Sequence, residues 1–130
     1  MPKPIKILLA VLAGFVAWFV VATIANLIVR AAIPGYVEAE PTMSFTLPMM
    51  FARLATGIVS SIVAGFACAF IARGLFVAVK ILATILVLFF LPVHYSLWEH
   101  FPAWYHAFFL ISLAPFVLLG GLIRRKGSMP

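Results

Sequence analysis

Four long apolar stretches make up most of the chain, and short segments that carry most of its polar residues separate them. The stretches cover residues 5–33, 47–73, 75–93 and 103–124. A bilayer core about 30 Å thick requires about 20 helical residues to cross it. Because the stretches are continuously apolar and do not alternate with a period of two, they favour helices over barrel strands. The pattern therefore predicts four transmembrane helices.

The connections between the stretches predict how the helices are arranged. Pro34-Gly35 ends the first stretch, Gly74 separates the second from the third, and residues 94–102 join the third to the fourth. Short connections place consecutive helices side by side and antiparallel. We therefore expect one domain, residues 1–130, with an all-α integral membrane fold. It is an up-down-up-down bundle of four transmembrane helices, built as two hairpins.

The composition narrows the possible functions. The chain is 66% hydrophobic and 9% charged, and its mean hydropathy is +1.24. Four spans leave no length for a soluble catalytic domain. The net charge of +6 does not indicate a nucleic-acid partner, because the basic residues lie at the ends of the stretches and not on a soluble module. The single cysteine, Cys68, excludes an intrachain disulfide and makes thiol–disulfide exchange chemistry an unlikely function.

The charged residues are sorted to opposite sides of the predicted bundle. All of the nine Lys and Arg residues except Arg30 and Arg53 lie near the two termini or beside the connection at Gly74. The other side carries all three acids, Glu38, Glu40 and Glu99. Basic residues in short loops mark the cytoplasmic side of a membrane protein. The sequence therefore predicts that both termini are cytoplasmic and that the acidic connections face outward.

The outer connection before the last stretch holds all three histidines of the chain. Imidazole and carboxylate groups bind zinc, copper or iron, so His94, Glu99, His100 and His106 are candidate ligands of a metal, haem or quinone site. The alternative is an interfacial belt, because Trp, Tyr and His side chains suit the headgroup layer. Gaps of six residues place the histidines on no common helical face. The sequence therefore assigns no metal ligand and implies no cofactor.

A second polar group lies at the outer ends of the first two stretches. Its members are Asn26, Arg30, Glu38, Glu40 and Arg53. An arginine partly buried in a membrane pairs with an acid or extends to the interface. We expect Arg53 or Arg30 to pair with Glu38 or Glu40 and so hold the long connection on the bundle. A contact with an anion or a substrate is the functional alternative.

Small residues recur every four positions along the second stretch, which lets another helix approach closely. They are Gly57, Ser61, Gly65 and Ala69, and the first stretch offers Gly14 in a similar row around Trp18. Packing of the first two helices against each other explains this stripe. The alternative is self-association, or docking on a larger membrane complex.

Several features of active membrane proteins do not occur in the sequence. No Asp, Glu, Lys or His lies near the middle of a stretch, where ion-coupled carriers need one, and no catalytic or phosphate-loop motif is present. We therefore predict a protein that is not an enzyme, with an accessory or self-associating role in the lipid bilayer. The alternative is a small transporter or channel with a path between the hairpins, past Asn26, Ser61 and Pro115.

Two segments carry a resemblance to known proteins. One is the opening run of residues 7–15, and the other is Phe101-Pro102-Ala103-Trp104-Tyr105-His106, which precedes the last stretch. Together with the four-span layout they resemble a family of small bacterial four-helix inner-membrane proteins to which no activity is assigned. The resemblance implies a location in the bacterial inner membrane. It supplies no catalytic residues.

Overall fold

The computed structural model describes residues 2–127, and every regular element among them is a helix. Four helices are long: α1 (Lys3–Ala32), α3 (Leu47–Ala72), α4 (Val77–Ser96) and α5 (Ala103–Gly127). Two are short: α2 (Tyr36–Ala39) and the 3-10 helix η1 (Trp98–His100). All four long helices are long and apolar enough to span a bilayer. The fold is therefore all-α, and it is compatible with a four-helix bundle.

The helix ends follow from local sequence. Gly35 has φ +83°, a left-handed conformation that a glycine adopts without strain, and it separates α1 from α2. At the end of α3, Arg73 and Gly74 both have positive φ, and the backbone N–H of Arg73 donates to the carbonyl of Ala69. This left-handed turn delays the start of α4 to Val77, two residues after the predicted position.

α4 also continues three residues beyond its predicted end at residue 93. Pro92 lacks an N–H, so its own helical hydrogen bond is lost. The helix nevertheless persists, because Leu97 donates to the carbonyl of Val93 just beyond the proline. As a result His94 belongs to the last turn of α4 and not to the connection that follows.

α3 is the central helix of the bundle, and it packs most extensively along α1 and along α5. The contact with α5 is a backbone contact. A Cβ atom on Gly65 would lie 1.9 Å from the carbonyl oxygen of Val117, and one on Gly120 would lie 1.9 Å from that of Ile62. Only glycine fits at either position, so these two residues fix where α3 and α5 cross.

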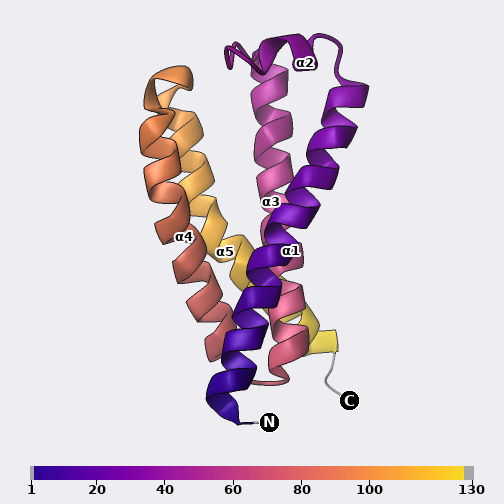
Figure 1. The fold of residues 1–130 in the computed structure, drawn as a ribbon, viewed down its shortest axis with the longest axis vertical. Coiled ribbons are helices and arrows are strands. Elements are labelled where there is room, and N and C mark those ends of the chain that lie inside the picture. The colour runs from indigo at the N-terminus through magenta and orange to yellow at the C-terminus, as the bar shows by residue number, and fades with distance from the viewer. Residues whose placement is uncertain (1, 128–130) are drawn as a thin grey trace.

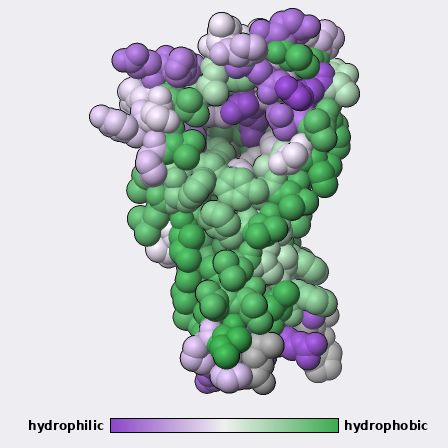
Figure 2. Space-filling view, in the orientation of Figure 1, coloured by the Kyte–Doolittle hydropathy of each residue, from purple (hydrophilic) through white to green (hydrophobic). Residues whose placement is uncertain are grey.

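The two ends of the molecule differ in charge, and we name them accordingly. The glutamate end carries α2, η1 and the acids Glu38, Glu40 and Glu99, whereas the arginine end carries the α3–α4 connection and the end of α5 (Figure 1). The helix pair α1–α3 diverges from the pair α4–α5 toward the glutamate end (Figure 1). Between the ends, apolar side chains cover the surface in a broad belt (Figure 2). Such a belt and four candidate spans suggest a multi-pass membrane protein.

Candidate binding cavity at the glutamate end

A cavity of about 370 Å³ lies where the two helix pairs diverge. All four long helices line it, and Figure 2 shows polar residues around the hollow at this end of the molecule. Its apolar walls are mainly aromatic: Trp18, Phe19, Phe90, Phe101 and Phe109. Its polar wall consists of Thr23, Asn26, Glu40, Arg53, Thr56, His94 and Tyr105. Concave sites with apolar walls and a few convergent polar groups are typical of small-molecule binding.

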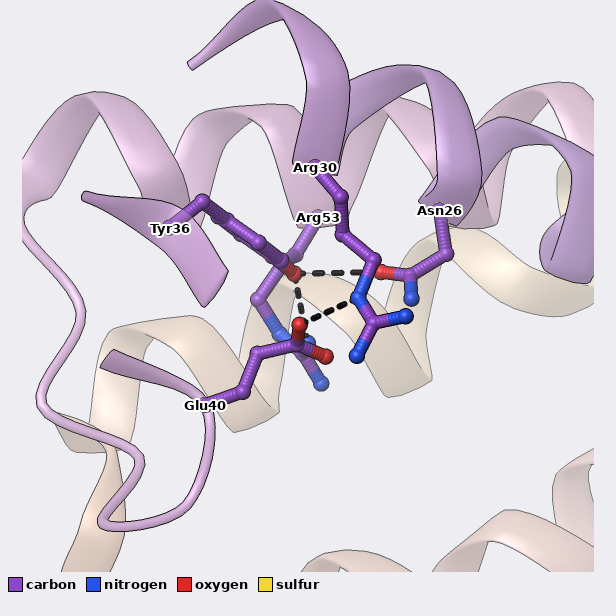
Figure 3. A network of polar contacts seen from close by, with 5 residues as sticks. All are labelled: Asn26, Arg30, Tyr36, Glu40 and Arg53. Carbon is purple, nitrogen blue, oxygen red and sulfur yellow. Dashed lines mark hydrogen bonds and ion pairs between the residues drawn. The ribbon is translucent and has the colours of Figure 1, made fainter. Parts of the chain in front are cut away.

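Arg53 is the cation of this cavity, and tyrosines hold it. Its Nε donates to the hydroxyl of Tyr105 at 3.2 Å, and its Nη1 donates to the hydroxyl of Tyr36 at 2.9 Å. The Tyr36 hydroxyl in turn donates to Oδ1 of Asn26 at 3.3 Å (Figure 3). A single side chain of α3 is therefore tied to α1, α2 and α5.

Aromatic rings support the same guanidinium from its faces. Its central carbon lies 4.7 Å from the ring centre of Phe45 and 5.4 Å from that of Phe101. Phe45 also stacks on Tyr36, and Phe101 stacks on Tyr105. Because Phe45 and Phe101 stack on each other as well, the four rings form one continuous row. Cation–π contacts stabilise a desolvated guanidinium without using its N–H donors. Nη2 of Arg53 has no hydrogen-bond partner among the described residues.

The expected pairing of arginine with acid involves Arg30. Its Nε lies 2.5 Å from Oε1 of Glu40, which ties the end of α1 to the connection that leads into α3 (Figure 3). Glu38 is exposed and lies apart from this pair. Among the described residues, Arg53 has no carboxylate partner. The structure therefore assigns the acid to one arginine and the phenols to the other.

Two of the three histidines meet beside the cavity. Nδ1 of His94 lies 2.7 Å from Nδ1 of His106, and both side chains are buried, with 6% and 1% of their surfaces exposed. Nε2 of His106 lies 3.4 Å from the carbonyl oxygen of Trp98, which can only accept, so Nε2 donates. Nδ1 of His106 then accepts a hydrogen bond from the Nδ1–H of His94. This tautomer leaves Nε2 of His94 as an acceptor on a residue that lines the cavity.

The other two metal candidates lie elsewhere. Glu99 and His100 belong to η1, and both are exposed. The described residues contain no group of three or more His, Cys, Asp or Glu side chains that could hold a metal ion. The structure therefore brings together His94 and His106 as a hydrogen-bonded pair and does not gather the four candidates into one site.

The small-residue stripe of α3 faces two different neighbours. Gly57 and Gly65 lie against Phe109 and Val117 of α5, whereas Ser61 accepts a hydrogen bond from Nε1 of Trp18 at 3.1 Å. Gly14 of α1 meets α3 at the carbonyl of Ala64. Ala69 is half-buried near the arginine end. The chain's own helices therefore cover most of this stripe, and α5 takes the place where we expected the first helix.

The sequence reasoning did not identify the tyrosines that hold Arg53. Tyr36 lies in the connection after α1 and is 1% exposed, and Tyr105 lies in the first turn of α5. One signal in the sequence pointed to them. An arginine inside an apolar stretch needs partners, and the same side of the bundle carries Tyr36 in the first outer connection and Tyr105 just after the second.

The cavity offers a defined set of interactions. Its lining includes the donors of Arg53, the acceptor of His94 and several aromatic rings. This arrangement can bind and orient a molecule that has a polar head and an apolar body. Comparison of the chain with protein-family models, with curated proteins and with solved structures finds no match.

Proposed function

We propose that this chain is a small multi-pass protein of the bacterial inner membrane with an accessory role, not an enzyme. In this proposal the chain crosses the bilayer four times as two hairpins, with both termini and the arginine end in the cytoplasm. The apolar belt between two polar ends supports the crossings. The gathering of basic residues at one end supports the orientation.

The accessory role is to bind an amphiphile in the cavity at the glutamate end. Arg53 carries this proposal, because a cation without a carboxylate partner lines an aromatic cavity. Its Nη2 and its charge favour a headgroup with carboxylate or phosphate oxygens. The rings of Phe19, Phe90 and Phe109 provide an apolar surface for the tail.

The depth of Arg53 fits this interpretation. Arg53 lies six residues after Leu47, the first residue of α3. A helical rise of about 1.5 Å per residue places it about 9 Å inside that end of the helix. In a membrane-embedded bundle this depth is the boundary between headgroups and hydrocarbon, where an amphiphile has its own polar group.

Native mass spectrometry of the protein in a neutral detergent tests the binding, with oleate and oleyl alcohol as probes. We expect oleate to bind more tightly than oleyl alcohol, and Arg53→Gln to remove most of that preference. Ala22→Phe places a ring in the cavity and should weaken oleate binding by about tenfold or more. Ile28→Phe is the matched control, because Ile28 is 63% exposed on the same helix. Equal binding by both phenylalanine variants would refute the site.

A transporter is the second candidate, and one observation favours it. The cavity lies between the two helix pairs, and the contact of α3 with α5 at Gly65 and Gly120 closes the bundle nearer the arginine end. A carrier would open that contact to release its cargo at the other side. The test measures whether proteoliposomes move a labelled lysophospholipid between leaflets in a protein-dependent way. If they do not, the transporter is refuted and binding remains as the proposed role.

The packing of the small-residue stripe on α3 argues against self-association through that stripe. Because α5 occupies Gly57 and Gly65, a second copy has no small-residue seam at that face. The accessory role that we propose therefore depends on the cavity and the bilayer. A larger membrane complex would have to dock on the lipid-facing surface.

A further inference from the structure

A second cavity, of about 490 Å³, lies at the arginine end of the molecule. The last turn of α3, the connection to α4 and the end of α5 form its walls. Three of the residues that line it are arginines: Arg73, Arg124 and Arg125. It is separate from the cavity at the glutamate end and shares no lining residue with it.

Aromatic rings position two of these arginines. The guanidinium carbon of Arg124 lies 5.0 Å from the ring centre of Phe70, and that of Arg125 lies 5.6 Å from the ring centre of Phe76. A ring contact uses the face of a guanidinium and does not occupy its N–H donors. Arg73 caps α3 in a left-handed conformation, so it belongs to the exposed connection at the mouth of the cavity.

Among the described residues, little neutralises the positive charge of these arginines. Its three acidic side chains, all within the described residues, lie at the glutamate end. Neither the Arg73 side chain nor that of Arg124 makes a hydrogen bond or an ion pair with another described residue. The Nε of Arg124 is buried and has no hydrogen-bond partner among them. Buried donors normally have partners, so this guanidinium has unused donor capacity.

We propose that this cavity binds a phosphate group. Planar guanidinium groups donate paired hydrogen bonds to phosphate oxygens, and a phosphate supplies negative charge at an end where the described residues have no acidic side chain. The phosphate belongs either to an anionic phospholipid or to a soluble phosphate compound. The position of the cavity at the end of the bundle places it at the headgroups of the cytoplasmic leaflet in the proposed orientation.

The experiment has a lipid arm and a phosphate arm. In the first, the protein is placed in phosphatidylcholine nanodiscs with a minor fraction of phosphatidylglycerol, and native mass spectrometry measures how much phosphatidylglycerol it retains. In the second, inorganic phosphate is titrated into the protein in dodecylmaltoside. Each arm compares the parent chain with Arg124→Gln, Arg73→Gln and Lys80→Gln. Lys80 is the matched control, because it is an exposed cation of the same end that does not line the cavity.

We expect Arg124→Gln to weaken binding by about tenfold more than Lys80→Gln does, since tenfold corresponds to the loss of one charge-assisted hydrogen bond. Arg73→Gln should act in the same direction, and its exposed position makes misfolding an unlikely cause. Retention of phosphatidylglycerol without phosphate binding identifies a lipid headgroup. Phosphate binding that Arg124→Gln weakens and Lys80→Gln does not identifies a soluble ligand.

Equal losses in Arg124→Gln and Lys80→Gln, or no binding in either arm, would overturn the proposal. Equal losses would mean that the arginines act only as general surface charge, and no binding would mean that the cavity takes no phosphate. The outcome is independent of the cavity at the glutamate end, because Ala22→Phe fills that cavity and should leave phosphate binding unchanged.

Discussion

The two ends of the bundle use arginine in opposite ways. At the glutamate end, Arg53 donates to two tyrosine hydroxyls and lies against two phenylalanine rings. At the arginine end, Arg124 lies against one ring, and its buried Nε has no partner among the described residues. The first arginine joins several segments of the chain and keeps only Nη2 for a ligand. The second makes no hydrogen bond to another described residue.

The difference comes from what the neighbouring connections contain. The connection between α1 and α3 carries Tyr36, Phe45 and Glu40, which supply acceptors and rings. The connection between α3 and α4 is short and contains no acid or hydroxyl group between Arg73 and Phe76. This connection therefore offers only backbone acceptors to the guanidinium groups beside it.

The largest expected effect comes from breaking the contact that lies between the two ends. Gly65→Leu would force α3 away from the carbonyl of Val117, so we expect a loss of about 3 kcal/mol or more in the free energy of unfolding. Ala55→Leu is the control, since Ala55 is exposed on the same helix. Reversible unfolding in mixed micelles measures both. Similar stabilities for the two variants would show that α3 and α5 do not cross at Gly65.

Arg53→Met tests the structural role of the arginine at the glutamate end. The substitution leaves two tyrosine hydroxyls without their donor and removes two cation–π contacts. We expect the free energy of unfolding to fall by about 2 kcal/mol, measured by the same unfolding experiment. A change below about 0.5 kcal/mol would mean that the tyrosines do not depend on Arg53.

Arg124→Met is the counterpart at the arginine end. It removes one cation–π contact and also removes a buried donor that lacks a partner, and these effects oppose each other. We therefore expect the free energy of unfolding to change by less than about 1 kcal/mol when neither phosphate nor anionic lipid is present. A loss as large as that of Arg53→Met would contradict the contrast between the ends.

The smallest effect should come from the exposed ion pair. Arg30→Gln removes the contact with Glu40, in which both side chains remain partly exposed. Exposed pairs contribute little, so we expect a loss of about 0.5 kcal/mol that shrinks further at high salt. A loss comparable to that of Arg53→Met would show that the acid, and not the tyrosines, holds the connection on the bundle.

The sequence predicts the helical architecture well because apolar length is a local property. Continuous apolar runs mark four helices, and four long apolar helices are present. The sequence does not predict which helix packs against each face of another helix. The glycines of α3 indicate a close approach, yet every neighbouring helix is similarly apolar. Nothing in the spacing of Gly57 and Gly65 distinguishes α5 from α1 as the partner.

The candidate sites were harder to predict for the same reason. His94 and His106 lie twelve residues apart and meet only because α4 continues past Pro92 and α5 starts at Ala103. The choice of Tyr36 and Tyr105 for Arg53, with Glu40 left to Arg30, depends on how α2 folds back over the bundle. Such pairings arise from tertiary packing, which residue spacing alone does not encode.

The orientation of the bundle places the two proposed sites at opposite faces of the membrane, and cysteine accessibility tests this central claim most directly. Cys68 is fully buried, and Cys68→Ala gives a background without cysteine into which Glu38→Cys or Arg73→Cys is introduced. A membrane-impermeant maleimide is then applied to intact bacterial spheroplasts. We predict labelling at position 38 and, until the membrane is permeabilised, none at position 73. Labelling at position 73 in intact spheroplasts, or equal labelling at both positions, would contradict the account.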